Sequence, residues 1–223
     1  MAIMTPDALD GPILAPRSGV AAKQLVVLLH GVGADGNDLI GLAPAFAESL
    51  PDAAFLSPHA PFPYDMAPFG RQWFSIRDFG AEARLEGVRA AAPILDSFLD
   101  AILAEYRLGP GELALVGFSQ GAMMALHAGL RRAEPIAGIL SYSGVLVGED
   151  HLAQEICSRP PVLLVHGEDD PLIPAAALPA ATAALEVNGI DVASHLCPRL
   201  GHGIDEKGIA EGHAFLARIF AGA

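Results

Sequence analysis

The sequence has 223 residues, of which 52% are hydrophobic and 17% are charged, and its 13 Lys and Arg against 26 Asp and Glu give a net charge of −13. This composition predicts a compact chain with a large core and excludes a disordered one. The negative charge disfavours nucleic acid and anionic membrane surfaces as partners, which leaves neutral small molecules as better candidates. We expect one domain over residues 1–223, in which residues 1–22 form an N-terminal extension or a first edge strand.

The beginning of the chain carries acids and prolines where a signal peptide would have basic residues and an unbroken apolar core. No segment reaches the roughly 18 uninterrupted apolar residues of a membrane span. The two cysteines, Cys157 and Cys197, are too few for a disulfide framework and lack the spacing of metal ligands. We therefore expect a cytoplasmic protein with reduced thiols and no stable membrane insertion.

Short runs typical of β-strands alternate with helical segments along the chain. We expect strands at residues 25–30, 53–59, 112–118, 136–143, 161–167 and 191–197, and helices at 38–50, 86–108, 120–132, 175–189 and 205–220. Several strand runs are apolar at consecutive positions, which indicates strands that are covered on both faces. The predicted fold class is α/β, with a mostly parallel central sheet and helices on both of its faces.

The first strand leads into LLHGVGADG (28–36), which has the G-x-G-x-x-G spacing of a dinucleotide-binding loop. Three features argue against that interpretation. The next strand ends without an acidic residue for a ribose, the helix begins after the glycines, and Asp35 and Asp38 would face a pyrophosphate with like charge. His30 is expected to pack or to form structural hydrogen bonds beneath this loop.

The alternation stops between residues 58 and 87, in a stretch rich in Pro, Gly and aromatic residues. A connection of this length is usually functional or disordered, and its aromatic residues favour a packed, functional segment. One interpretation makes it the main wall of an apolar pocket, formed by Phe62, Tyr64, Phe69, Trp73 and Phe74. The alternative is that most of these aromatic side chains only seal a satellite core.

A G-x-S-x-G pattern, Gly-Phe-Ser-Gln-Gly at 117–121, stands between a predicted strand and a helix that begins with small residues. This strand–turn–helix setting is the one that the pattern requires when its serine is a nucleophile. The glycines permit a tight turn, in which Ser119 takes a strained conformation that exposes its hydroxyl. A buried serine at a glycine-rich strand end is the alternative, since the pattern alone is only suggestive.

A serine nucleophile needs an acidic residue and a histidine, which in this architecture follow it in that order on loops after strands. Three acids, residues 168–170, come directly after the strand at 161–167. Asp170 is preferred because Pro171 biases it towards an extended conformation, and Asp169 is the alternative.

Three histidines follow these acids, and their positions differ. His195 alternates within a strand and His213 falls in the last helix, whereas His202 lies between two glycines in the loop after the last strand. That loop allows the ring to reach the serine, so we expect His202 to be the general base.

An oxyanion hole needs two backbone N–H groups that point at one place, one from the residue after the nucleophile and one from a loop after an early strand. Gln120 follows the nucleophile directly. The 28–36 loop is well placed to supply the second N–H group, that of Val32.

These pieces together resemble the carboxylesterase and phospholipase family of α/β-hydrolases, which includes the acyl-protein thioesterases. The matching stretches are LLHGVGADG, RQWFSI (71–76), GFSQGA (117–122), SYSG (141–144), HGEDDPLIP (166–174) and LGHGI (200–204). The resemblance implies a triad of Ser119, Asp170 and His202 and an oxyanion hole from Val32 and Gln120, with no metal and no cofactor. It also places Trp73 beside the pocket, and we add Phe74 and Ile173 as expected substrate contacts.

Two positions depart from the family pattern. Ser75 stands where an Asp is common after Trp-Phe, and Gly203 follows the histidine where a larger residue is frequent. These departures affect the expected pocket shape and leave the triad intact.

The expected function is hydrolysis of carboxylic esters with short to medium acyl chains through an acyl-enzyme. An acyl-protein thioesterase or a lysophospholipase is the alternative because the same triad serves all three chemistries, and a non-catalytic binding protein is disfavoured because no triad member is lost. Only residues 144–160 lie where lids commonly enter this fold, so we expect an open site without a large cap. The family also allows a homodimer.

Overall fold

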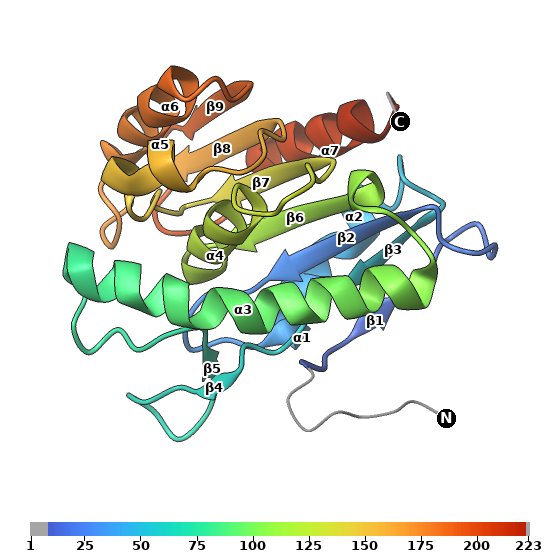
Figure 1. The fold of residues 1–223 in the computed structure, drawn as a ribbon, viewed down its shortest axis with the longest axis horizontal. Helices are drawn as coiled ribbons and strands as arrows, with labels where there is room; N and C mark the ends of the chain where they lie inside the picture. The colour runs from blue at the N-terminus through green and yellow to red at the C-terminus, as the bar shows by residue number, and fades with distance from the viewer. Residues whose placement is uncertain (1–8, 222–223) are drawn as a thin grey trace.

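A seven-stranded sheet forms the centre of the computed structural model, which describes residues 9–221 (Figure 1). The strand order is β1-β3-β2-β6-β7-β8-β9, and all neighbours are parallel except β1 and β3. The strands are β1 (Ile13–Leu14), β2 (Gln24–Leu29), β3 (Ala53–Leu56), β6 (Leu113–Phe118), β7 (Gly138–Tyr142), β8 (Val162–Gly167) and β9 (Val192–Cys197). The predicted mostly parallel sheet is confirmed. Part of the N-terminal segment forms the edge strand β1, and its first eight residues lie outside the described range.

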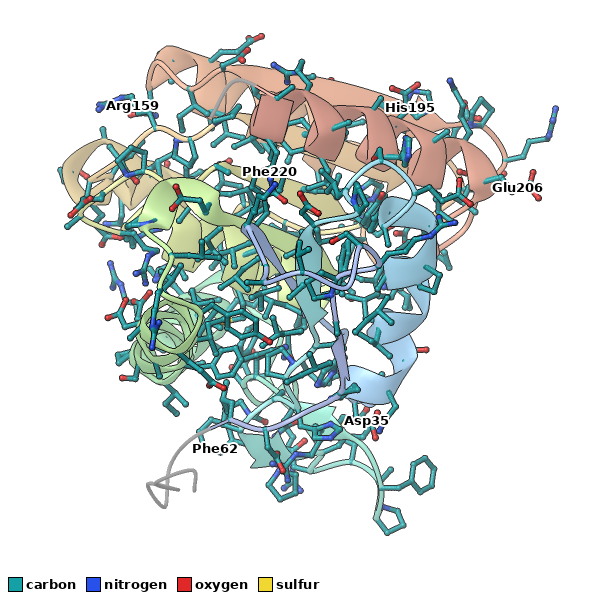
Figure 2. All side chains as sticks on the ribbon, turned by 90° about the vertical axis from the view of Figure 1, so that its right-hand side faces the viewer. Asp35, Phe62, Arg159, His195, Glu206 and Phe220 are labelled. Atoms are coloured by element: carbon teal, nitrogen blue, oxygen red, sulfur yellow. The ribbon has the colours of Figure 1, made fainter. Side chains whose placement is uncertain are left out.

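Both faces of the sheet are apolar, and each is covered by helices. In β2, residues 25, 27 and 29 contact one core layer and residues 26 and 28 contact the other, and all five are fully buried. The first layer is formed by α3 (Ala81–Tyr106), α4 (Gln120–Gly129), α5 (Leu152–Glu155) and α6 (Ala177–Val187), and the second by α1 (Gly36–Leu39), α2 (Ala43–Phe46) and α7 (Glu206–Ala221). Figure 2 shows side chains filling the space between the sheet and these helices.

Most predicted helices are observed with shifted ends, and one is broken. In place of the predicted helix at 38–50, the structure has α1, a 3-10 segment at Ile40–Leu42 and α2. These begin at Gly36, so the expectation that the helix starts after the glycines of the 28–36 loop is wrong. Gly41 weakens helical continuity, and Pro44 fits the first turn of a new helix because it lacks the N–H that would continue the old one. Further 3-10 segments lie at Pro110–Glu112 and Glu149–His151. The long helix α3 begins at Ala81, earlier than the predicted residue 86.

The strand order reverses at β2, so consecutive strands are added on opposite sides of it. After β2 the chain adds β3 on one side, and after α3 it adds β6 on the other. The carboxyl ends of β2 and β6 are neighbours, with Leu29 paired to Gly117. In open α/β sheets, ligands bind beyond the carboxyl ends of strands at such a point. The start of α3 and helix α5 lie at this same end of the sheet (Figure 1).

The long aromatic segment contains a small hairpin, β4 (Phe62–Pro63) and β5 (Arg71–Gln72), which is pressed against the 28–36 loop. The N–H of Gly33 donates to the carbonyl of Arg71 at 2.8 Å, and the N–H of Arg71 donates to the carbonyl of Ala34 at 2.8 Å. Gly70 has a φ of 83°, and a Cβ there would lie 2.1 Å from the Gly33 oxygen. The segment is therefore packed, as its composition predicts.

No large cap covers the carboxyl end of the sheet in the described part of the chain. Between β7 and β8 the structure contains only Glu149–His151 and α5 as helical segments. Both cysteines are free, with Cys157 exposed and Cys197 buried. Among residues 9–221, no helix combines the length and the apolar character that crossing a membrane requires.

His127 makes the stability of the fold sensitive to acid. It lies in α4 with 4% of its surface exposed, and its Nδ1 has no hydrogen-bond partner among the described residues. Burial, assisted by the nearby Arg131, lowers its pKa from 6.5 to about 4. The unfolded chain therefore binds a proton near pH 6.5 that the folded chain does not bind until about pH 4, so stability falls as the pH drops through this range.

We expect His127→Leu to remove this acid sensitivity. Urea unfolding at about pH 7 and at about pH 4.5 should show that the wild type loses roughly 2 to 3 kcal/mol more than the variant between the two conditions. The exposed His151, changed to Leu in the same way, serves as the control and should leave the difference unchanged. Equal losses for the wild type and His127→Leu would contradict the assignment.

Candidate active site

Ser119 occupies a strained turn between β6 and α4. Its backbone angles are φ 54° and ψ −116°, a region that residues other than glycine rarely adopt. A Cβ on Gly117 would lie 2.4 Å from the Gly121 oxygen, and a Cβ on Gly121 would lie 1.8 Å from the Leu29 oxygen. Only glycine fits at these two positions, which is the physical meaning of the G-x-S-x-G pattern.

The structure brings together Ser119, His202 and Asp170, which come from three separate loops. The Oγ of Ser119 lies 2.9 Å from Nε2 of His202, and Nδ1 of His202 lies 2.7 Å from Oδ2 of Asp170. The carboxylate can only accept a hydrogen bond, so Nδ1 carries the proton and Nε2 accepts from the serine hydroxyl. The alternative acid, Asp169, is exposed.

The environment of Asp170 keeps its carboxylate ionised. Burial of its side chain, which is 0% exposed, raises its pKa, but hydrogen bonds from the Ile173 N–H, His202 and the Leu172 N–H outweigh this and lower the pKa below its ordinary value. Oδ1 accepts from the N–H groups of Leu172 at 2.8 Å and Ile173 at 2.9 Å. Below this turn, Nε2 of His166 lies 3.0 Å from the Ile173 carbonyl, a supporting contact that the sequence reasoning missed.

The loop that carries His202 is held against the end of β8. A Cβ on Gly167 would lie 2.2 Å from the Gly201 oxygen, so the two backbones meet at glycines. The N–H of Asp169 donates to the Leu200 carbonyl at 2.9 Å, which ties the acid loop to the histidine loop. The His202 ring also lies 5.0 Å from the Phe118 ring, between centroids. The position of His202 is therefore fixed by backbone contacts and by one aromatic neighbour.

Two backbone N–H groups near Ser119 are free to bind an anion. Gln120 is the first residue of α4, where helical N–H groups have no partner within the helix. In residues 9–221, neither its N–H nor that of Val32 donates a hydrogen bond within the protein. A Cβ on Gly31, the residue before Val32, would lie 3.4 Å from Cβ of Ser119, so the 28–36 loop contacts the serine turn. This arrangement can stabilise negative charge on an oxygen.

The side chain of Gln120 clamps the aromatic segment to the serine turn, which the sequence reasoning did not foresee. Its Oε1 accepts from the Trp73 N–H at 2.8 Å and its Nε2 donates to the Phe74 carbonyl at 2.8 Å. The Trp73 indole N–H donates to the His30 carbonyl at 3.0 Å. Residues 71–74 thus hold both the 28–36 loop and the start of α4.

His30 has a structural role, as expected. It is fully buried, its Nε2 accepts from the Ala60 N–H at 2.9 Å, and its Nδ1 lies 2.7 Å from the Gly31 carbonyl. Because Nε2 accepts, Nδ1 must carry the proton and donate to Gly31. Burial lowers the pKa of His30, which keeps the ring neutral in this position.

A cavity of about 280 Å³ opens at Ser119 and His202. Its apolar wall is formed by Val32, Ile76, Phe79, Met123, Leu172 and Ile173, which includes the predicted Ile173. The long segment contributes Ile76 and Phe79 to this wall, although no signal in the sequence distinguished them from its other apolar residues. Met123 lies one helical turn after Ser119 and Leu172 precedes Ile173, so both could have been inferred from their neighbours.

Of the two interpretations of the aromatic residues at 62–74, the pocket wall is wrong, and the alternative of packing away from the pocket holds for Phe74 and Tyr64. Trp73 and Phe74 are 0% and 5% exposed and do not line the cavity. The hydrogen bond of Trp73 to His30 turns its ring into the core, and a Cβ on Gly87 would lie 2.6 Å from Phe74, whose ring packs on α3. The other three do not line the cavity either: Tyr64 packs on Gly33, and Phe62 and Phe69 are 41% and 74% exposed.

Neither of the two departures from the family pattern lines the cavity. Ser75 is exposed and donates to Asp65 at 2.6 Å, and Arg77 pairs with the same carboxylate, so the hairpin supplies an acid beside this position. A Cβ on Gly203 would have its nearest neighbour, Leu200, at 4.0 Å, so the residue after His202 has open space around it. Among residues 9–221, no group of three or more His, Cys, Asp or Glu is arranged to hold a metal ion.

Comparison with known proteins agrees with this architecture. A crystal structure of esterase PE8 superposes with a TM-score of 0.92 at 45% sequence identity, over 95% of this chain and 99% of that one. Esterase YpfH from Escherichia coli is 32% identical over 188 residues, which cover 83% of this chain and 78% of that protein. Acyl-protein thioesterase 1 from Gibberella zeae is 27% identical, over 92% of this chain and 95% of that protein.

A model of the Phospholipase/Carboxylesterase family matches residues 14–219, which is nearly the whole chain. The mostly parallel sheet described above is the fold expected for this family. The chain belongs to the phospholipase/carboxylesterase family and has the α/β-hydrolase fold.

Proposed function

We propose that this chain is a carboxylesterase that hydrolyses esters with short to medium acyl chains, with Ser119 as nucleophile, His202 as general base and Asp170 as its partner. Membership in a family of serine hydrolases with esterase and acyl-protein thioesterase relatives is the background. The observation that carries the proposal is the 2.9 Å contact between Ser119 Oγ and His202 Nε2 at the mouth of an apolar cavity.

The first half of the reaction forms an acyl-enzyme. As Ser119 Oγ attacks the ester carbonyl, its proton passes to His202 Nε2, and Asp170 stabilises the imidazolium through Nδ1–H. The carbonyl oxygen becomes an oxyanion, which the N–H groups of Val32 and Gln120 bind. The tetrahedral intermediate then expels the alcohol, which takes the proton from His202.

The second half releases the acid by the same steps with water in place of serine. His202 takes a proton from water as it attacks the acyl-enzyme, and the oxyanion forms again at the same two N–H groups. Collapse of this intermediate breaks the bond to Ser119 Oγ, which regains its proton from His202. The carboxylic acid leaves and the starting state returns.

The size and lining of the cavity favour esters of modest length. Its volume of about 280 Å³ lies near the lower end of ligand pockets, which span about 300 to 1,000 Å³. Phe79 and Leu172 at its wall are 41% and 67% exposed, so the site is open to solvent rather than enclosed. A short acyl group is buried in this space, whereas a long one must continue beyond it.

Thioester or lysophospholipid hydrolysis is the second candidate, and the thioesterase relative favours it. The triad and the two N–H groups would serve a thioester equally well, so only the pocket distinguishes the substrates. A purely binding function has no support in the geometry, because all three triad side chains are in contact.

We expect Ser119→Ala to lower kcat by a factor on the order of 10⁶, as loss of a triad nucleophile does in other serine hydrolases. The same change should abolish labelling by a fluorophosphonate probe, while thermal unfolding stays close to wild type. Ser97→Ala, which changes an exposed serine on α3, is the matched control and should label normally. A Ser119→Ala protein that keeps a tenth of wild-type turnover would rule out this nucleophile.

We expect Gln120→Glu to lower kcat by about a hundredfold, a loss comparable to that of one oxyanion donor. Glutamate still accepts from the Trp73 N–H but cannot donate to the Phe74 carbonyl, so two oxygens would face each other at 2.8 Å and the segment would move. Gln154→Glu, the same change at an exposed position of α5, is the control for charge. An unchanged kcat in Gln120→Glu would show that the clamp does not support the oxyanion hole.

Matched oxygen esters and thioesters of butyrate, octanoate and palmitate should separate the two candidate functions. We expect kcat/KM to be highest for butyryl or octanoyl oxygen esters and to fall for palmitoyl esters, because the cavity cannot enclose the long chain. A maximum at palmitoyl thioester would favour the thioesterase alternative. The Ser119→Ala protein gives the background rate for each substrate.

A further inference from the structure

A second cavity adjoins the catalytic cavity and shares part of its wall. The two have Phe79, Leu172 and Ile173 in common, and the second has a volume of about 220 Å³. We call this second cavity the side chamber, and its remaining lining residues are Arg84, Val145, Pro174 and Ala177. The two cavities therefore lie next to each other at these three residues, of which Phe79 and Leu172 are partly exposed at the rim.

Arg84 is the single polar residue that lines the side chamber. It lies at the start of α3, and its guanidinium carbon is 4.7 Å from the centre of the Phe79 ring. Phe79 lines the catalytic cavity as well, so the positive charge lies against a ring that contacts both cavities. The stacking on the ring holds the guanidinium in place without neutralising its charge.

Among residues 9–221, the guanidinium of Arg84 has no anionic partner. Its Nε is buried without a hydrogen bond, and no carboxylate of the described residues lies within 4 Å of it. Other arginines of the same region are paired, since Arg89 and Arg131 contact Glu155 and Arg132 contacts Asp96 and Asp100. A buried polar atom without a partner is uncommon in folded proteins, so the guanidinium of Arg84 retains hydrogen-bonding capacity for a ligand.

Acidic residues line a groove on the far side of Arg84, and their charge disfavours an anion in that groove. A larger groove of about 590 Å³ shares Arg84, Val145 and Ala177 with the side chamber. Its wall carries four carboxylates, those of Glu82, Glu86, Glu149 and Asp150, and also Arg89 and His151. An anionic group is therefore attracted to Arg84 from the catalytic side and repelled by the groove beyond it.

We propose that the side chamber is a subsite for a carboxylate carried by the ester substrate, and that Arg84 binds this carboxylate through paired N–H···O hydrogen bonds. The proposal rests on the ester-hydrolase function given above and names the substrate class of that same site. A planar guanidinium matches a carboxylate with two parallel hydrogen bonds, which gives a preference for this group over a neutral one. The carboxylate can belong to the acyl part or to the alcohol part of the ester.

The test compares charged and neutral esters of matched length. The acyl arm uses the monomethyl esters of succinate, adipate and suberate against the corresponding dimethyl esters, and the alcohol arm uses 6-acetoxyhexanoate against hexyl acetate. In one arm, Arg84→Gln should lower kcat/KM for the charged member by about ten- to a hundredfold, mainly through KM, and should leave the neutral member unchanged. The arm that responds identifies the part of the ester that enters the side chamber.

Two further variants separate recognition from general effects. Arg84→Lys keeps the charge but loses the paired geometry, so it should recover only part of the preference. Arg107→Gln removes the same charge from an exposed position at the other end of α3, and it should leave both members of each pair unchanged. Equal losses for charged and neutral esters in Arg84→Gln, or no loss in either arm, would overturn the proposal.

A binding measurement tests the carboxylate subsite separately from ester hydrolysis. Calorimetric titration of adipate and of neutral 1,6-hexanediol needs no turnover, and only adipate should bind more weakly to Arg84→Gln than to the wild type. If esters are not hydrolysed but adipate binding depends on Arg84, the esterase proposal fails and the subsite stands. If esters are hydrolysed and adipate binds both proteins equally, the subsite fails alone.

Discussion

The close approach of helix α4 to the end of strand β2 is the contact on which the site depends. A Cβ at Gly121 would lie 1.8 Å from the Leu29 carbonyl oxygen, so any larger residue would push the helix away from the strand. This contact sets the first N–H groups of α4 beside the loop that leaves β2. The Ser119 hydroxyl and the N–H groups of Val32 and Gln120 can then face one place, where the proposed reaction puts negative charge on a carbonyl oxygen.

The contact between Ser119, His202 and Asp170 could be predicted from the sequence because each of these residues carries a local constraint. Glycines at 117 and 121 are required by backbone contacts, Asp170 is followed by a proline, and His202 is flanked by glycines in a loop. The order of these residues along the chain and their positions after strands follow from the parallel sheet. The alternation of strands and helices was equally readable, because β2 buries both of its faces.

The cavity wall could not be predicted because it depends on contacts between distant parts of the chain. The hydrogen bonds of Gln120 to residues 73 and 74 orient the aromatic segment, and nothing in the local pattern indicates them. The hydrogen bond of the Trp73 indole to His30 then turns its ring into the core, and Ile76 and Phe79 line the cavity instead. The aromatic residues of the 58–87 segment explain why it is packed, but only its tertiary contacts determine which side chains face the cavity. The break of the predicted helix at 38–50 has a more local cause, since Pro44 begins a new helix.

The backbone conformation of Ser119 is unfavourable in free energy, and contacts elsewhere in the molecule must compensate for it. A φ of 54° is unfavourable for any residue with a Cβ by about 1 to 3 kcal/mol, and glycine alone escapes this penalty. Replacement of Ser119 by glycine would therefore remove both the penalty and the hydroxyl, whereas alanine would keep the penalty and lose only the hydroxyl. At this position, the free energy of unfolding favours glycine, whereas the proposed reaction requires a serine.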